Sequence, residues 1–123
     1  MIIDEIYSML KDYFDVLQNQ DMATFDRVFH PDCVLYSAQD GALVVRPYKE
    51  YRAVVQGRKS PQEGGFPRHD EILSVDVMAP EAAMVKVRLR LFDNIMVDYL
   101  NLLKINGKWM IMAKIYHRQA NVA

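Results

Sequence analysis

Five polar side chains on neighbouring predicted strands form the best candidate for a ligand site in this sequence. Tyr99 and Asn101 lie on one strand, Lys114 and Tyr116 on the next, and Arg88 would lie beside Tyr99. A few convergent polar groups among apolar walls are typical of a small-molecule pocket. A buried lysine or arginine there suits an anionic or carbonyl-bearing ligand. If this face is instead the outer face of the sheet, the cluster is ordinary exposed surface.

Asp98 and Tyr13 are the candidate catalytic residues. Asp98 is the single carboxylate on an otherwise apolar strand face, and His117 would lie near it across the strand pair. The two could form an acid–base dyad, or a structural or interfacial ion pair. Tyr13 lies on the apolar stripe of the first predicted helix, where it is either a core residue or a hydrogen-bond donor to a pocket.

No pattern for binding a metal or a phosphate is present. The three histidines share no ligand spacing, and Cys33 has no cysteine partner. Gly64 and Gly65 are not followed by the helix and the Lys-Ser/Thr pair of a phosphate-binding loop. We therefore expect neither a metal nor a cofactor.

The composition of the chain argues against several classes of protein. The 123 residues carry 15 Lys+Arg and 16 Asp+Glu, and 51% are hydrophobic, which suits one globular domain spanning residues 1–123. A formal charge of −1 argues against a nucleic-acid partner. No apolar run reaches the roughly 18 residues of a membrane span, and the first residues lack the pattern of a secretory signal. We expect a cytoplasmic protein that binds neither nucleic acid nor membranes.

Periodicity predicts three helices and a long antiparallel meander. Apolar residues at three- and four-residue spacing indicate a first helix through Leu17, Asp21 caps a second, and Gly57 closes a third. Strands are predicted at 33–37, 42–45, 72–78, 82–92, 95–104 and 108–117. The glycine- and proline-rich segment 58–67 is expected to gate the mouth of a pocket. This order predicts a single α+β domain.

The predicted hairpin turns assign side chains to faces of the sheet. Turns at 93–94 and 106–107 would pair Tyr99 with Arg88 on one side and with Lys114 on the other. The helices can cover one face only, and the second face also carries large apolar residues. Because exposed apolar patches mark interfaces, we expect a homodimer formed through the sheet. One β-bulge would exchange the two faces beyond it.

Two stretches resemble the nuclear transport factor 2-like superfamily, which is also called the cystatin-like cone. They are DYFDVLQNQD at 12–21 followed by FDRVFHPDCV at 25–34, and NGKWMIMAKIY at 106–116. The sequence is most similar to the small bacterial lumazine-binding-like and SnoaL-like proteins of that group. The resemblance implies a cone-shaped α+β barrel, in which three N-terminal helices pack on a curved, mainly antiparallel sheet around a pocket.

The resemblance also suggests roles for individual residues. Ketosteroid isomerases of this group use a tyrosine and a protonated aspartate as an oxyanion hole and a second aspartate as base. Tyr13 matches the tyrosine, Ser37 falls on the base, and the oxyanion aspartate falls on or beside Tyr99, one position from Asp98. A standard isomerase is therefore not expected. The resemblance turns four side chains toward the pocket, namely Tyr99, Asn101, Met112 and Tyr116.

These observations predict a protein that binds a small apolar or aromatic ligand between the curved sheet and the helices. The ligand-binding residues expected are Tyr13, Ser37, Arg88, Tyr99, Asn101, Met112, Lys114 and Tyr116. A cofactor-independent isomerase, dehydratase or cyclase that uses Asp98 is one alternative. A dimeric association module with a vestigial pocket is the other.

Overall fold

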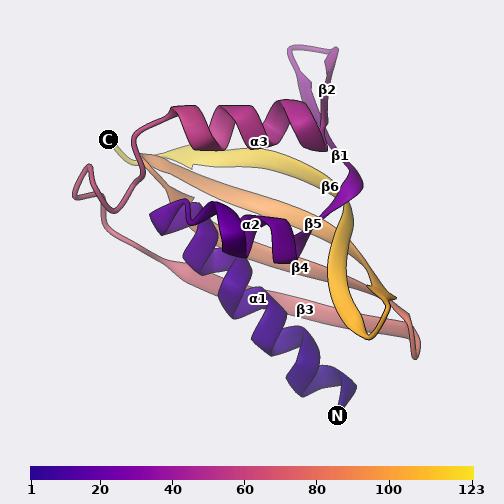
Figure 1. Ribbon diagram of the computed structural model, residues 1–123. Helices are drawn as coiled ribbons and strands as arrows, with labels where there is room; N and C mark the ends of the chain where they lie inside the picture. The colour runs from indigo at the N-terminus through magenta and orange to yellow at the C-terminus, as the bar shows by residue number, and fades with distance from the viewer.

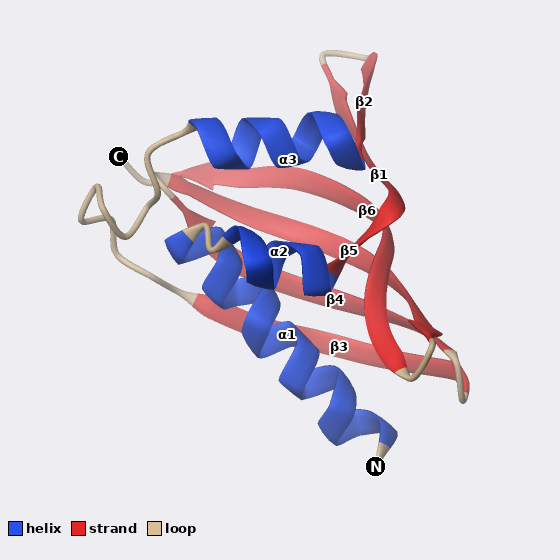
Figure 2. Cartoon of the chain, in the orientation of Figure 1, coloured by secondary structure: helices blue, strands red, loops and turns tan.

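Three helices cover one face of a single curved sheet in the computed structural model, which describes residues 1–123 (Figures 1 and 2). The helices are α1 (Ile2–Asn19), α2 (Met22–Val28) and α3 (Tyr48–Gly57). The strands are β1 (Phe29–Gln39), β2 (Ala42–Pro47), β3 (Asp70–Ala79), β4 (Ala82–Leu91), β5 (Asn94–Ile105) and β6 (Lys108–Asn121). This is the α+β cone that the resemblance implied, with three helices on a curved sheet.

The six strands form one open sheet in the order β2-β1-β6-β5-β4-β3. Every pair is antiparallel except β1 and β6, which run parallel. The sheet is therefore mixed and its two edges, β2 and β3, do not meet. Its curvature leaves a concave face, which the helices cover, and a convex face without a covering layer (Figure 2).

The apolar stripe of α1 packs on the concave face. Ile6, Leu10, Tyr13 and Leu17 recur at helical spacing and are buried, as the sequence predicted. The helix ends where Gln20 adopts a left-handed conformation (φ 55°), and Asp21 then caps α2 by accepting a hydrogen bond from the backbone amide of Ala23. Opposite α1 lie buried side chains of the sheet, namely Val85, Val87, Leu89, Leu100, Leu102 and Ile111. None of the helices is both long and apolar enough to cross a membrane.

The turn between β4 and β5 lies one residue earlier than the sequence predicted. Leu91 pairs with Asn94, and Phe92 takes a positive φ of 57° at the turn. Arg88 therefore lies opposite Val97, whereas we had placed it opposite Tyr99. Because the shift moves each partner by two residues, the faces of β4 and β5 stay as predicted.

A β-bulge between β5 and β6 overturns the predicted faces at the end of the chain. Leu102 pairs with Ile111 but Asn101 pairs with Ala113, so Met112 is an extra residue without a partner. Beyond it, Lys114 and Tyr116 turn to the concave face with Asp98. The predicted pairing of Tyr99 with Lys114 is wrong for this reason, because Tyr99 lies opposite Ile115.

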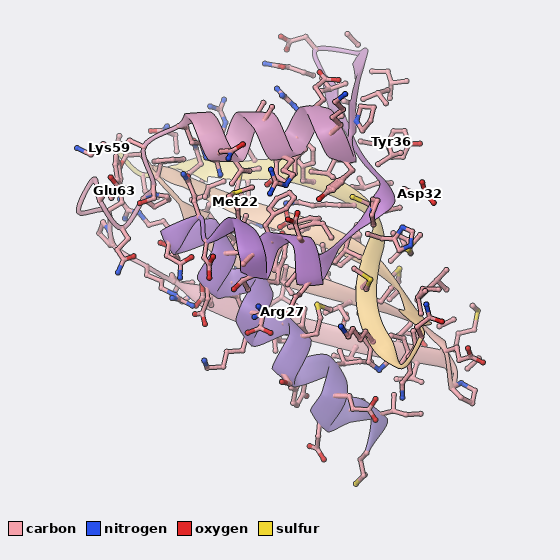
Figure 3. All side chains as sticks on the ribbon, in the orientation of Figure 1. Met22, Arg27, Asp32, Tyr36, Lys59 and Glu63 are labelled. Carbon is pink, nitrogen blue, oxygen red and sulfur yellow. The ribbon has the colours of Figure 1, made fainter.

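The convex face presents a row of exposed side chains that runs from strand to strand. Tyr36, Ile115 and Tyr99 are successive neighbours on β1, β6 and β5, and Lys86 on β4 lies over the Tyr99 ring at 5.5 Å. Ile115 is 52% exposed and Tyr99 42%. Figure 3 shows Tyr36 pointing away from the helices. The homodimer through the sheet stays a prediction, and this row is where we expect the contact.

Replacing Ile115 by glutamate places a charge in the middle of this row. We expect the wild-type chain to have the mass of two chains in sedimentation equilibrium at micromolar concentration, and Ile115→Glu to shift it toward one. The matched control is Tyr7→Glu, on the exposed side of α1, which should leave the mass unchanged. A wild-type mass of one chain contradicts the prediction.

Candidate functional site

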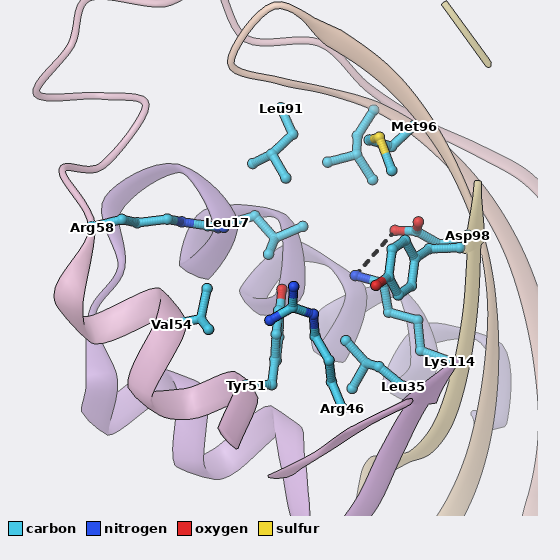
Figure 4. Close-up of a pocket in the computed structure, with 12 residues that line it drawn as sticks. Leu17, Leu35, Arg46, Tyr51, Val54, Arg58, Leu91, Met96, Asp98 and Lys114 are labelled. Carbon is cyan, nitrogen blue, oxygen red and sulfur yellow. Dashed lines mark ion pairs between the residues drawn. The ribbon is translucent and has the colours of Figure 1, made fainter. Parts of the chain in front are cut away.

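A cavity of about 180 Å³ lies between the concave face and the helices (Figure 4). Its wall is mainly apolar and draws on α1, α3, β1, β2, β4, β5, β6 and the residue after α3. It is lined by Leu17, Leu35, Arg46, Tyr51, Val54, Arg58, Leu89, Leu91, Met96, Asp98, Lys114 and Tyr116. An engineered cavity of about 150 Å³ in another protein holds benzene. The volume therefore suits a ligand of about one ring.

One buried carboxylate organises the polar part of the wall. The Tyr13 hydroxyl donates a hydrogen bond to Oδ2 of Asp98 at 2.6 Å, and the Lys114 ammonium lies 3.5 Å from the same oxygen. Tyr13 is 0% exposed, Asp98 1% and Lys114 5%. The other carboxylate oxygen, Oδ1, is buried without any hydrogen-bond partner. A buried acceptor with no donor costs free energy, and a donor group on a ligand would remove that cost.

Three different elements bring these groups together. Strand alternation places Asp98 on the same face as Leu100, and the helical period places Tyr13 on the inward stripe of α1. Lys114 reaches this face only because the bulge at Met112 reverses the alternation of β6. The contact between Asp98, Tyr13 and Lys114 therefore depends on this irregularity in the pairing of β5 and β6.

Burial and the charge of Asp98 act on the pKa of both neighbours. Burial lowers the pKa of Lys114, but the negative charge of Asp98, the interaction with Tyr51 and a hydrogen bond to Asp98 together outweigh burial and leave this pKa above its ordinary value. Burial and then the Asp98 charge raise the pKa of Tyr13 well above its usual range. Lys114 is therefore an ammonium and Tyr13 a neutral phenol at neutral pH.

Aromatic rings surround the Lys114 ammonium. It lies 5.3 Å from the ring centre of Tyr13, 5.6 Å from that of Tyr51 and 5.7 Å from that of Tyr116. The negative faces of aromatic rings attract a cation within about 6 Å. This cage holds the positive charge in a fixed place beside the cavity.

Four of the predicted site residues come together here. Asp98, Lys114 and Tyr116 line the cavity, and Tyr13 lies directly behind Asp98. Ser37 is on the same face but not in the wall, because its hydroxyl donates to the backbone oxygen of Tyr116 at 3.0 Å. It thereby supports the strand that carries Tyr116.

The remaining predicted ligand residues lie outside the cavity, and their placement in the pocket is wrong. Tyr99 and Asn101 are exposed on the convex face, where Asn101 and Met112 border a shallow groove. Arg88 is also on that face and forms an ion pair with Glu71 at 3.0 Å. The error has two sources. The bulge at Met112 was not predicted, and the face that carries Tyr99 was taken to be the concave one.

His117 does not lie beside Asp98, so the predicted dyad is wrong. It is opposite Val97 on the convex face, whereas Asp98 is opposite Tyr116. The ionic partner of Asp98 is Lys114 instead. The same bulge explains this change, since it moved Lys114 to the concave face and His117 away from it.

The sequence reasoning missed two cationic residues of the cavity wall. Arg46 lies opposite Leu35 in the β1–β2 hairpin, and Arg58 directly follows α3. The two strands meet at the Asp40-Gly41 turn, and counting outward from the Gln39–Ala42 pair yields the Leu35–Arg46 pair. Nothing in the sequence alone points Arg58 inward.

Segment 58–67, the predicted gate, is tied to the rest of the chain. The backbone amide of Gln62 donates to the backbone oxygen of Gln18 at 3.0 Å, and the Gln20 side chain donates to that of Arg58 at 2.7 Å. Lys59 and Glu63 lie at the outer edge of the molecule (Figure 3). Of this segment, Arg58 alone lines the cavity.

No group of three or more His, Cys, Asp or Glu side chains is arranged to hold a metal ion. Cys33 is buried in β1, and this burial raises the pKa of its thiol to about 11. A thiol in that state is neutral at physiological pH and is a weak nucleophile.

Comparisons with known proteins agree with the fold. Residues 2–117 match the model of the family described as "Putative lumazine-binding". A curated protein named aldolase FrzH, from Cladobotryum sp., is 27% identical over 107 residues, which cover 85% of this chain and 82% of that protein.

Two solved structures show the same architecture. A nuclear transport factor 2-like protein of unknown function from Shewanella baltica OS155 has a TM-score of 0.84 at 21% identity, covering 97% of this chain and 94% of that one. A ketosteroid isomerase-like protein from Erwinia carotovora atroseptica has a TM-score of 0.73 at 14% identity, covering 95% of each chain. These likenesses establish the nuclear transport factor 2-like fold.

Removing one member of the buried ion pair should destabilise the protein. Lys114→Met leaves the Asp98 carboxylate buried without a counter-charge, and we expect a loss of about 3–5 kcal/mol in the free energy of unfolding. The double variant Asp98→Asn, Lys114→Met should lose less unfolding free energy than Lys114→Met alone, because no unpaired charge remains. Urea denaturation of the three chains measures this, and an equal loss in both variants would contradict the pairing.

Alkaline pH should weaken the fold through Tyr13 and Lys114. Both folded-state pKa values are raised, so the folded chain holds these protons more tightly than the unfolded chain. The resulting stability is complete below about pH 10 and is lost as pH rises, by up to about 1.4 kcal/mol per pH unit for each group. Urea denaturation between pH 8 and pH 11 should show a shallower decline for Tyr13→Phe than for wild type. An equally steep decline of the unfolding free energy in both chains would contradict this prediction.

Proposed function

Because the chain belongs to the family described as "Putative lumazine-binding", we propose that its cavity binds a small carbonyl compound. We further propose that Asp98 moves a proton on that compound. The reaction class is acid–base chemistry beside a carbonyl group, as in isomerisation, dehydration or cyclisation. The ligand is largely apolar and about one ring in size.

The free oxygen of Asp98 is the observation that carries this proposal. It belongs to a carboxylate that is 1% exposed and lines the cavity, and it has no hydrogen-bond partner. Tyr13 and Lys114 hold the other oxygen, so the side chain has a fixed orientation. A fixed carboxylate with one free oxygen can accept a proton from a carbon next to a carbonyl.

Lys114 supplies the complementary charge. An ammonium group has three donors, and Asp98 takes one of them. A second donor can bind the carbonyl oxygen of the ligand. When the proton passes from carbon to Oδ1 of Asp98, the C–H electron pair forms a carbon–carbon double bond. The π electrons of the carbonyl group move onto the carbonyl oxygen, where the ammonium stabilises the negative charge of the enolate. Return of the proton to the same or another carbon completes the reaction.

The relative that is named an aldolase is compatible with this chemistry. Aldol reactions and proton shifts both pass through an enolate, so the same pair of groups could serve either. The raised pKa of Lys114 favours its action as a fixed cation over attack on a carbonyl, which needs the neutral amine.

Binding without a reaction is the second candidate function. The apolar wall and the cationic side chains of the cavity favour ligand binding whether or not Asp98 acts as a base. One property separates the two functions: a binding protein does not exchange protons of its ligand with solvent, whereas a proton-transfer enzyme does.

Exchange of α-protons in D2O tests the catalytic proposal. Five- and six-membered cyclic ketones, such as cyclohexanone, fit the size of the cavity and can be followed by ¹H NMR. We expect wild type to accelerate exchange and Asp98→Asn to lower the rate by about 10²- to 10⁴-fold, the range of general-base catalysis.

Arg88→Gln is the matched control, because Arg88 is a charged residue of the sheet outside the cavity. It should exchange at the wild-type rate. Near-ultraviolet circular dichroism checks that Asp98→Asn keeps its packing. If wild type exchanges no ketone of the panel faster than Asp98→Asn does, Asp98 is not a base for this class and binding without a reaction is favoured.

A further inference from the structure

We infer that the ligand of the cavity is a small oxo acid, whose carboxylate is bound by Arg46 and Arg58. This deepens the proposed function, on which it rests for the carbonyl group near Asp98. The two arginines would form a second recognition element of the cavity, in addition to Asp98 and Lys114.

The cavity wall has an excess of positive charge. Arg46, Arg58 and Lys114 line it, and Asp98 is its single carboxylate, so three cations face one anion and the lining carries a net charge of +2. The whole chain has a formal charge of −1. The positive charge is therefore concentrated at this site and does not follow from the composition of the chain.

The guanidinium group of Arg58 is held in place but has no anionic partner. Its Nε donates to the side-chain oxygen of Gln20 at 3.0 Å, and its carbon lies 5.2 Å from the ring centre of Phe92. One terminal nitrogen, Nη2, is buried and has no hydrogen-bond partner. A buried donor of this kind is costly unless a ligand satisfies it.

Arg46 reaches the same cavity from a different part of the chain. It extends from β2, and its guanidinium points toward the cavity beside Tyr51 (Figure 4). Arg46 forms none of the ion pairs of the structure, and Asp98 is already bound by Lys114. Its planar donor fork is therefore free to bind a carboxylate.

Other arginines of the chain show that this lack of partners is specific to the cavity. Four of them form ion pairs with carboxylates on the surface, namely Arg52, Arg68, Arg88 and Arg90. Arg27 and Arg118 are exposed, where water solvates the charge. Arg46 and Arg58 are half-buried at a cavity, and neither forms an ion pair with a carboxylate.

The arrangement also sets the orientation of the ligand. Arg58 enters the view of Figure 4 on the side opposite Asp98 and Met96, with the apolar residues between them. A carboxylate at the arginines avoids repulsion by Asp98, and the carbonyl group then lies near Asp98 and Lys114. One short apolar skeleton can span the two ends of a cavity of about 180 Å³.

Benzoate and benzamide test the anion site directly. They share a ring and differ in charge at one group, and isothermal titration calorimetry at low salt measures both. We expect wild type to bind benzoate at least about tenfold more tightly than benzamide, as hydrogen bonds to a charged group allow. Raising NaCl from 20 mM to 500 mM should weaken benzoate binding and leave benzamide binding unchanged.

Single variants then assign the effect to residues. Arg46→Gln and Arg58→Gln should each reduce the preference for benzoate, by about tenfold or more. Arg52→Gln is the matched control, since Arg52 lies on α3 but is paired with Asp26 outside the cavity. It should keep the wild-type preference.

The outcomes separate this inference from the proposed function. Equal binding of benzoate and benzamide, or binding of neither, overturns the anion site, even if ketone exchange depends on Asp98. Preferential benzoate binding that needs both arginines, without any Asp98-dependent exchange, supports the anion site and removes the catalytic role. Asp98→Asn should bind benzoate at least as tightly as wild type, because it removes a negative charge from the wall.

Discussion

The contact between Asp98, Lys114 and Tyr13 is the constraint on which the rest of the site depends. A carboxylate and an ammonium taken out of water cost several kcal/mol each, and only close pairing and further hydrogen bonds offset this. The three side chains come from β5, β6 and α1. Their contact therefore requires the helix to lie against these two strands, and it joins the packing of the core to the chemistry of the cavity.

The apolar and the charged groups of the cavity wall suit different parts of a ligand. Its leucines and Met96 favour a small carbon skeleton, while Arg58 lies on the side opposite Asp98. Lys114 has a counter-charge in Asp98, but Arg46 and Arg58 have none. The Asp98–Lys114 pair therefore helps to hold the fold together, whereas the two arginines lack a counter-charge that a ligand could supply.

The two faces of the sheet serve different purposes because the helices cover one of them. The concave face encloses the core and the cavity, whereas the convex face exposes Tyr36, Tyr99 and Ile115. Polar residues on a strand are not by themselves evidence of a site: Arg88 and Tyr99 have the same types as residues that line the cavity, yet they lie on the convex face. Which polar residue is functional depends on the layer that covers its face.

Residue spacing alone determined the helices, the hairpins and the family resemblance, because these follow from local periodicity and turn chemistry. It also singled out Asp98 and Tyr13, since a carboxylate on an apolar strand face and a tyrosine on an apolar helical stripe are local patterns. The tertiary structure decided what contacts them. Met112 carries no signal for a bulge, yet that one extra residue turns Lys114 inward and His117 outward. Arg58 likewise reaches the cavity only through the path of the chain after α3, because such long-range contacts are set by packing and not by spacing.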